Sequence, residues 1–186
     1  MRIQLSLIYD VCLNRASAAM SLSYGGEIRL AVLDDAPAIL DIFQHCDLFA
    51  STGHRQDHIG LIDVMDWLES VTDNHPMLVL EEQGKVIAWC SVEPFYGLPA
   101  FDSACEVSVY VSPNWQGKGV GTQLFQYLET NQIEFGFTHL VAYIYASNLE
   151  SQGFFKRQGF DQWGLLPNIA QNEQIKEDVF ILGREF

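Results

Sequence analysis

Hydrophobic and polar positions alternate with two different periods along the chain, and the change of period predicts its elements. Runs rich in β-branched and aromatic residues predict strands at 27–32, 75–82, 86–95, 105–111, 139–145, 161–167 and 177–186. Apolar residues at helical spacing predict helices at 34–46, 61–71, 121–136 and 148–160. Polar stretches at 51–60 and 96–104 predict loops.

The order of these elements predicts a mixed α/β (α+β) fold. The runs at 75–82 and 86–95 are separated by a short turn and should form a hairpin. The helix at 121–136 is a crossover between the strands on either side of it, and a right-handed connection makes those strands parallel. We expect one mostly antiparallel central sheet of about seven strands, flanked by helices. It forms a single domain over residues 27–186, preceded by an N-terminal extension at 1–26.

The net charge argues against nucleic-acid and membrane partners, and the positions of the cysteines indicate the cellular compartment. The 186 residues include 24 acidic and 10 basic side chains, a net charge of −14. Such a chain lacks the basic face that duplex nucleic acid or a membrane surface requires, and no run approaches the ~20 apolar residues of a membrane helix. Cys90 and Cys105 lie inside apolar runs, which indicates buried thiols in a reducing cytoplasm. An acidic surface more often serves solubility than a specific function, and it also favours a cationic, amine-bearing substrate.

Three glycines fall within six residues, "QGKGVG" at 116–121, between a predicted strand and the predicted helix that follows it. Glycines allow left-handed dihedrals and close approach of a ligand, and helix N-termini present unpaired N–H groups, so the segment can bind phosphate. The alternative is a tight turn with no ligand. The spacing fits neither a P-loop nor a dinucleotide fingerprint.

This segment and its neighbours resemble a known superfamily. "EVSVYVSPNWQGKGVGTQLFQYL" resembles the signature of the GNAT acyl-CoA N-acyltransferases, Q/R-x-x-G-x-G/A, with Gln116, Gly119 and Gly121 at the fixed positions. "ASNLESQGFFKRQGF" resembles the strand end and helix that follow in that superfamily. Other segments between residues 27 and 186 look most like the phosphinothricin acetyltransferase-type branch.

The resemblance implies a GNAT fold with a β-α-β core that binds an acyl-CoA, and acetyl-CoA as the cosubstrate. The pyrophosphate would lie on the backbone N–H groups after Pro113, and Lys118 would add positive charge. Asn148 would bind the pantetheine amides, although Asn is also a common helix N-cap, and both roles can hold together. The residues that this resemblance assigns to the cofactor are Val109, Tyr110, Val111, Gln116, Gly117, Lys118, Gly119, Val120, Gly121, Thr122, Asn148, Ser151 and Phe155.

An amine must lose a proton to attack a thioester, so the reaction needs a base. Alternation along 105–111 places Glu106, Ser108 and Tyr110 on one face of the strand, opposite Cys105. Glu106 is the candidate base, and the resembled branch has Glu at this position. A partly desolvated Glu would have a raised pKa. The alternative is a solvated Glu on an open sheet face.

The chain departs from the resembled branch at two positions. Phe155 stands where relatives carry Tyr or His, so no side-chain acid is expected there for the departing thiolate. Leu98 stands where relatives often carry Arg, so a group that anchors a substrate carboxylate is expected to be missing. Tyr96, Phe101 and Ser108 are the candidate substrate-binding residues.

The expected function is acetylation of the primary amine of a small substrate, such as an amino acid or a phosphinothricin-like or methionine-derived compound. Acetylation of an aminoglycoside, polyamine or protein N-terminus is an alternative, as is a catalytically silent CoA-binding domain. His54 and His58 are four residues apart without a third ligand nearby, so no metal is expected. The resembled branch implies a homodimer.

Overall fold

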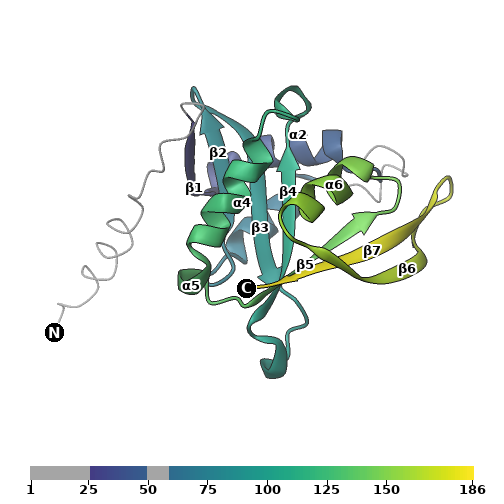
Figure 1. Cartoon of the computed structure of the whole chain (residues 1–186). Coiled ribbons are helices and arrows are strands. Elements are labelled where there is room, and N and C mark those ends of the chain that lie inside the picture. The colour runs from purple at the N-terminus through teal and green to yellow at the C-terminus, as the bar shows by residue number, and fades with distance from the viewer. Residues whose placement is uncertain (1–25, 50–58) are drawn as a thin grey trace.

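The computed structural model describes residues 26–49 and 59–186. The described chain contains one seven-stranded sheet in the order β1-β2-β3-β4-β5-β7-β6 (Figure 1). Neighbouring strands are antiparallel except β4 and β5, which are parallel, as the crossover helix between them predicts. The strands are β1 Glu27–Leu30, β2 Met77–Glu82, β3 Lys85–Pro94, β4 Ala104–Val111, β5 His139–Tyr145, β6 Asp161–Gln171 and β7 Lys176–Glu185.

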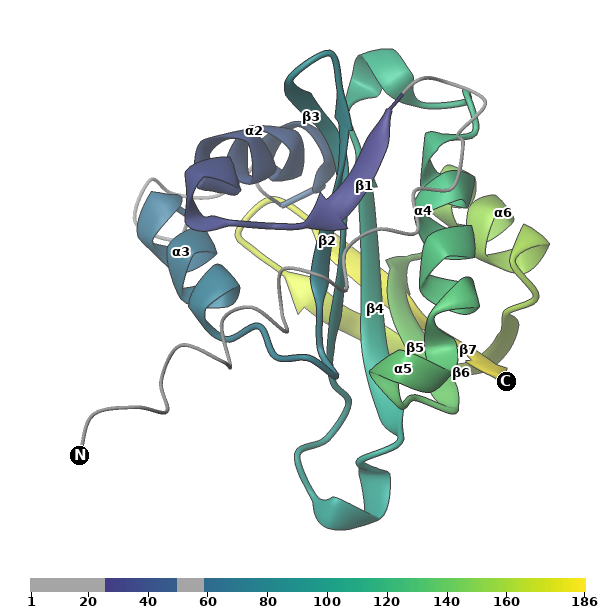
Figure 2. The ribbon, with the colours of Figure 1, turned by 90° about the vertical axis from the view of Figure 1, so that its left-hand side faces the viewer.

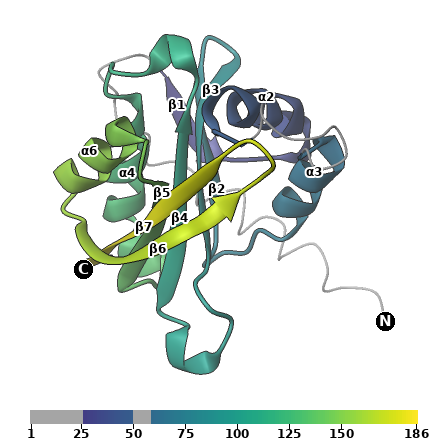
Figure 3. The same ribbon diagram turned by 90° about the vertical axis from the view of Figure 1, so that its right-hand side faces the viewer.

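Helices cover both faces of the sheet (Figures 2 and 3). One face carries α2 (Ala36–Cys46) and α3 (Leu61–Glu69), and the other carries α4 (Val120–Thr130), α5 (Gln132–Phe135) and α6 (Leu149–Arg157). Short 3₁₀ turns lie at Leu33–Asp35 (η1), Pro99–Phe101 (η2) and Pro113–Trp115 (η3). None of the helices in the described ranges combines the length and the apolar character that a bilayer crossing needs.

Two apolar cores follow from this layering. The larger core lies under α4 and α6 and includes Leu124, Phe125, Leu140 and the predicted buried thiols Cys90 and Cys105. The smaller core lies under α2 and α3. Cys90 is fully buried and Cys105 is 2% exposed, which confirms that the β3 and β4 thiols face the interior.

The sheet divides into two halves along the line between β4 and β5. These strands are paired only from Ala104–His139 to Glu106–Val141. Beyond that point β4 continues along β3 as far as the Ala88–Val111 pair, while β5 continues along β7. The edges of β4 and β5 therefore diverge toward their carboxyl ends, and a gap opens in the middle of the sheet.

Two elements differ from the sequence-based expectation. The strand expected to end at Pro167 continues to Gln171, because β6 is an edge strand whose register shifts between Leu166 and Ala170. Proline is tolerated at such an irregularity on an edge, and Asn168 there has a φ of 49° with its N–H donating to Asp178. The helix expected over 121–136 is interrupted at Asn131, which separates α4 from α5.

Candidate active site

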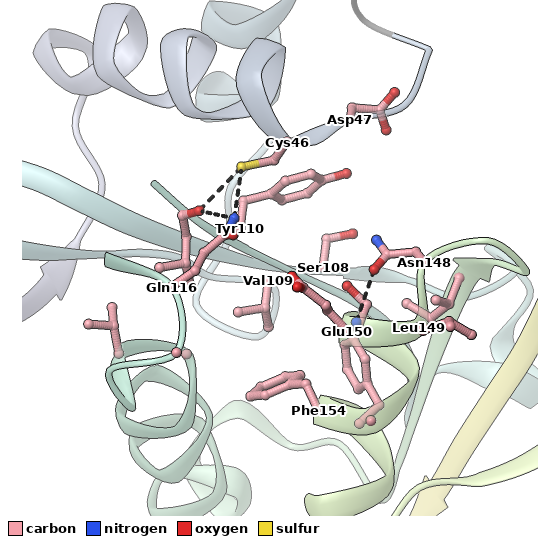
Figure 4. A pocket seen from close by; sticks show the side chains of 18 of the residues that line it. Cys46, Asp47, Ser108, Val109, Tyr110, Gln116, Asn148, Leu149, Glu150 and Phe154 are labelled. Atoms are coloured by element: carbon pink, nitrogen blue, oxygen red, sulfur yellow. Dashed lines mark hydrogen bonds between the residues drawn. The ribbon is translucent and has the colours of Figure 1, made fainter. Parts of the chain in front are cut away.

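A cavity of about 1170 Å³ occupies the gap between β4 and β5. Its walls are the carboxyl halves of these two strands, the turn into α4, the first turns of α6 and the end of α2. Figure 4 shows Cys46 and Gln116 together on one side of the cavity and Asn148 and Leu149 on the other. The cavity is large enough for a ligand of cofactor size.

The glycine segment forms the turn into α4 at the mouth of this cavity. Gly117 and Gly119 have φ values of 69° and 84°, in the left-handed region that side chains disfavour. No atom lies within 4 Å of where a Cβ would stand at either position, so this backbone is open to a ligand. Gly119 is the N-cap of α4, and the N–H groups of Val120, Gly121 and Thr122 have no intrahelical acceptor. These backbone amides line the cavity.

Gly121 has a different role from the other two glycines. A Cβ at this position would stand 3.3 Å from the Phe154 ring and 3.5 Å from Val111. The missing side chain therefore lets α4 approach α6 and β4 closely. The Lys118 ammonium lies 5.1 Å from the centre of the Trp115 ring, and Lys118 is not part of the cavity lining.

The unpaired edge of β4 presents backbone groups to the cavity. Phe95 N–H donates to Ala104 O and Ser112 N–H donates to Ile87 O, so even-numbered residues of β4 direct their backbone groups toward β3. Val109 and Val111 therefore direct theirs toward the side on which no strand follows.

Gln116 and Cys46 satisfy one of these backbone groups. The Gln116 Nε2 donates to Val111 O at 3.0 Å, and the Cys46 Sγ donates to the same oxygen at 3.2 Å. Gln116 thus ties the α4 turn to the end of β4, and Cys46 ties the end of α2 to it. Desolvation raises the pKa of the Cys46 thiol, which favours the neutral donor.

The start of α6 forms the opposite wall. Asn148 is the N-cap of α6, and its Oδ1 accepts from the Ser151 N–H at 3.0 Å. This confirms the capping role considered for Asn148, and both residues line the cavity. Gln152 donates to the carbonyl oxygens of Tyr145 and Ala146, which fixes the turn from β5 into α6.

Glu106 lies where β4 and β5 part, at the last paired position of the two strands. It is half-buried, and its neighbours Val107 and Ser108 line the cavity, although Glu106 itself does not. Desolvation, and then the charge of Glu93 on β3, raise the pKa of the Glu106 carboxyl above its ordinary value. This direction is the one that a general base requires.

The remaining predicted residues occupy three different places. Tyr110 stacks on Trp89 with ring centres 4.4 Å apart, while it also lines the cavity. Phe155 is 2% exposed and packs against Phe160 at the cavity's inner wall. Tyr96 and Phe101 contact each other on the exposed loop between β3 and β4 and do not line the cavity.

Several cavity residues were not expected from sequence. Cys46 and Asp47 reach the cavity from the end of α2, and Tyr143 and Tyr145 reach it from β5. The Tyr145 hydroxyl donates to Asp47 Oδ2 at 3.4 Å. Period-two alternation over 139–145 predicts that the two tyrosines share one face of the strand. No local feature of the sequence indicates that the end of α2 lies beside the cavity.

The described ranges contain no group of three His, Cys, Asp or Glu side chains that could hold a metal ion. His54 and His58, considered above as a metal site, lie outside the described residues, as do residues 1–25 of the expected N-terminal extension.

The described fold combines a sheet that opens between two parallel strands with a glycine-rich helix start at the opening. The model of the acetyltransferase (GNAT) family matches residues 37–160. The chain belongs to the GNAT family of acetyltransferases, which confirms the resemblance drawn from sequence.

Relatives agree with this assignment. The chain is 36% identical over 159 residues to a Bacillus subtilis (strain 168) protein named "Putative phosphinothricin acetyltransferase YwnH", which covers 85% of this chain and 98% of that protein. It is 30% identical over 144 residues to the "L-amino acid N-acyltransferase MnaT" of Escherichia coli (strain K12), covering 77% and 84%. The structure of yncA from Salmonella typhimurium, solved with its cofactor acetyl-CoA, has a TM-score of 0.75 and 27% identity, covering 86% and 93%.

Proposed function

We propose that the protein transfers the acetyl group of acetyl-CoA to the primary amine of a small molecule, with Glu106 as the general base. The observation that carries the proposal is the cavity between the diverging strands β4 and β5, with unpaired amides in the turn into α4 and the half-buried Glu106 directly before the lining residues Val107 and Ser108. The solved relative that contains acetyl-CoA supports this donor.

The donor has binding groups along the whole cavity. The amides of Gly117, Gly119, Val120, Gly121 and Thr122 form a site for the pyrophosphate, since they combine free N–H groups with the positive end of the α4 dipole. The backbone groups of Val109 and the N–H of Val111 serve the pantetheine amides, in the place of a missing neighbouring strand. The Val111 carbonyl already accepts from Gln116 and Cys46. Lys118, outside the cavity lining, serves the remaining phosphate at its mouth.

The reaction is a direct displacement. The amine nitrogen attacks the thioester carbonyl carbon and its proton passes to the Glu106 carboxylate, directly or through water. The carbon–sulfur bond then breaks and CoA leaves as the thiolate. The buried Phe155 stands at the position expected for a general acid, and its side chain cannot donate a proton. The thiolate therefore departs unprotonated and takes a proton from solvent.

The names of the relatives indicate which acceptors to test first. Phosphinothricin and free L-amino acids are the groups named for the Bacillus subtilis and Escherichia coli proteins. The acceptor side near Glu106 also includes Ser108, whose hydroxyl shares the face of that carboxylate.

Replacing Glu106 tests the base. Glu106→Gln should bind acetyl-CoA in calorimetry as the wild type does, while kcat for amine acetylation, followed by release of free CoA, falls about 100-fold or more. Glu134→Gln, an exposed Glu on α5, is the matched control and should keep full activity. Unchanged turnover in Glu106→Gln removes Glu106 as the base.

Calorimetry separates the enzyme from a silent domain. Wild-type protein that binds acetyl-CoA but releases no CoA with any acceptor of a broad amine panel would be a CoA-binding domain without catalysis. Absence of acetyl-CoA binding at millimolar concentration would contradict the proposed site itself.

A further inference from the structure

Two carboxylates lie directly opposite each other at the point where the sheet divides. Glu93 on β3 and Glu106 on β4 are register partners, so their side chains project from the same face of the sheet. Opposite residues of an antiparallel pair have Cβ atoms about 4.5–5.5 Å apart. This face carries Ser91, Glu93, Glu106 and Ser108, and it is the face opposite to the α4 and α6 core.

Glu93 is held in place by a buried neighbour. The Ser91 hydroxyl donates to Glu93 Oε1 at 3.0 Å, and Ser91 is only 3% exposed. One oxygen of Glu93 is thus fixed by the protein, while the residue as a whole remains exposed. This arrangement fixes the direction of the carboxylate without neutralising its charge.

Cations of the described residues do not neutralise this pair. Within residues 26–49 and 59–186, neither Glu93 nor Glu106 takes part in an ion pair. The strand register places the two charges side by side, and the Glu93 charge adds to desolvation in raising the pKa of the Glu106 carboxyl. Like charges directly opposite each other destabilise a sheet, and such a local conflict commonly marks a functional position.

The two carboxylates, Glu93 and Glu106, favour an acceptor that carries a second positive charge. A free amino acid would bring its carboxylate toward two negative charges, and Leu98 supplies no positive charge in the adjoining loop. An acceptor with a second ammonium group would instead pair with Glu93 while its reacting nitrogen lies near Glu106. Because neighbouring strands are about 4.8 Å apart, the two nitrogens should be separated by a short chain of about three or four carbons.

We propose that Glu93 is a specificity-determining residue that binds the distal ammonium of a short-chain diamine acceptor. The inference rests on the proposed function, because it requires that acetyl-CoA acetylates an amine beside Glu106. The acceptor inferred here differs from the L-amino acid in the name of the Escherichia coli relative.

The test compares three acceptors of equal length with wild-type protein. The first is 1,4-diaminobutane, the second is 1-aminobutane, which lacks the second charge, and the third is 4-aminobutanoate, which reverses it. We expect kcat/KM to decrease in that order. Rates are measured at about pH 9, where alkyl amines are still largely protonated.

A variant assigns the preference to Glu93. In Glu93→Gln the kcat/KM ratio of 1,4-diaminobutane to 1-aminobutane should fall about tenfold, as expected for loss of one charge-assisted contact. The ratio is the readout, because loss of the Glu93 charge also removes one cause of the raised Glu106 pKa and therefore changes the rate with every acceptor. Glu93→Lys should raise the relative activity on 4-aminobutanoate, and Glu134→Gln should leave all ratios unchanged.

The outcomes distinguish the two proposals. Acetylation of 4-aminobutanoate or free amino acids at least as fast as the diamine, or a selectivity ratio that Glu93→Gln leaves unchanged, overturns the role of Glu93 and leaves the proposed function intact. Failure of wild-type protein to acetylate any amine removes the proposed function, and the diamine inference with it. Should Glu93→Gln fail to fold, the acceptor ratios of Glu93→Lys assign the preference to this position.

Discussion

Glu106 lies in surroundings that differ from those of an ordinary surface carboxylate. It lies at the last paired position before the sheet divides, and desolvation together with Glu93 raises its pKa. Its position on the polar face of β4 was predictable from period-two alternation, since Cys105 and Val107 on the other face are buried. The opposite Glu93 was not identified, because strand register between β3 and β4 is not readable from either strand alone.

The raised pKa predicts how Glu106→Gln changes stability with pH. A carboxyl whose folded pKa lies above its unfolded pKa favours the neutral form, so the ionised form destabilises the fold once pH exceeds the folded pKa. Glu106→Gln should therefore be more stable than wild type at neutral pH, by up to about 1 kcal/mol, or a Tm increase of up to about 4 °C.

The difference in the free energy of unfolding between Glu106→Gln and wild type should shrink as pH falls through the folded pKa. It should disappear below about pH 4, where the Glu106 carboxyl is neutral in both the folded and the unfolded state. Thermal unfolding of both proteins over this pH range measures it. A Glu106→Gln variant that is less stable than wild type at neutral pH would contradict the direction of the shift.

Other single residues show what local sequence left open. Gln116 was assigned to the cofactor through the family pattern, and its side chain in fact holds the Val111 carbonyl. Asn148 caps α6. Both contacts join residues that are close in sequence, and both are hydrogen bonds that side-chain amides commonly make. The contact of Cys46 with Val111 spans 65 residues and has no local signal.

At the scale of elements, the turn into α4 is the feature that sequence predicted best. Pro113, the glycines and the amphipathic run that follows them indicate a loop that opens a helix, and α4 begins at Val120. The pattern did not distinguish glycines that need positive φ, Gly117 and Gly119, from Gly121, which is needed for close packing. That distinction depends on α6, which contributes Phe154 from a distant part of the chain.

Replacing Gly119 tests the turn as a binding element. Gly119→Ala places a side chain at a φ of 84° and should lower stability by about 1 kcal/mol. It should also weaken acetyl-CoA binding measured by calorimetry, by about tenfold or more, because the strained turn redirects the amides at the start of α4.

Gly136→Ala is the matched control. Gly136 has a φ of 77° at the C-cap of α5, outside the cavity lining, so its replacement should lower stability to a similar extent and leave acetyl-CoA binding unchanged. Equal binding by Gly119→Ala and wild type would mean that the turn does not bind the donor.

At the scale of the whole molecule, the alternation of elements was sufficient to predict a mixed sheet with one parallel pair, and the family pattern identified its class. The division of the sheet was not predictable, because it depends on where the β4–β5 pairing stops rather than on the residues of either strand. The same holds for the cavity, whose walls come from three separate stretches of the chain, 45–48, 107–122 and 143–157.

The homodimer expected from sequence remains a prediction at this scale. The described chain exposes several large apolar side chains on β5 and β6, among them Tyr143, Trp163, Leu165 and Ile169, and apolar surface of this kind is common at protein interfaces. Light scattering coupled to size-exclusion chromatography should give about twice the 21.0 kDa of one chain. A mass of one chain at all concentrations would contradict the dimer.

The gap in the sheet gives the donor an unusual relation to the fold. On the proposed function, acetyl-CoA forms hydrogen bonds with the edge of β4 that no strand of the polypeptide pairs with. In each catalytic cycle these hydrogen bonds form when the donor binds and are lost when CoA leaves. Three residue pairs, from Ala104–His139 to Glu106–Val141, join β4 to β5. On the proposed function, the remainder of the junction between the two parts of the sheet is supplied by the substrate.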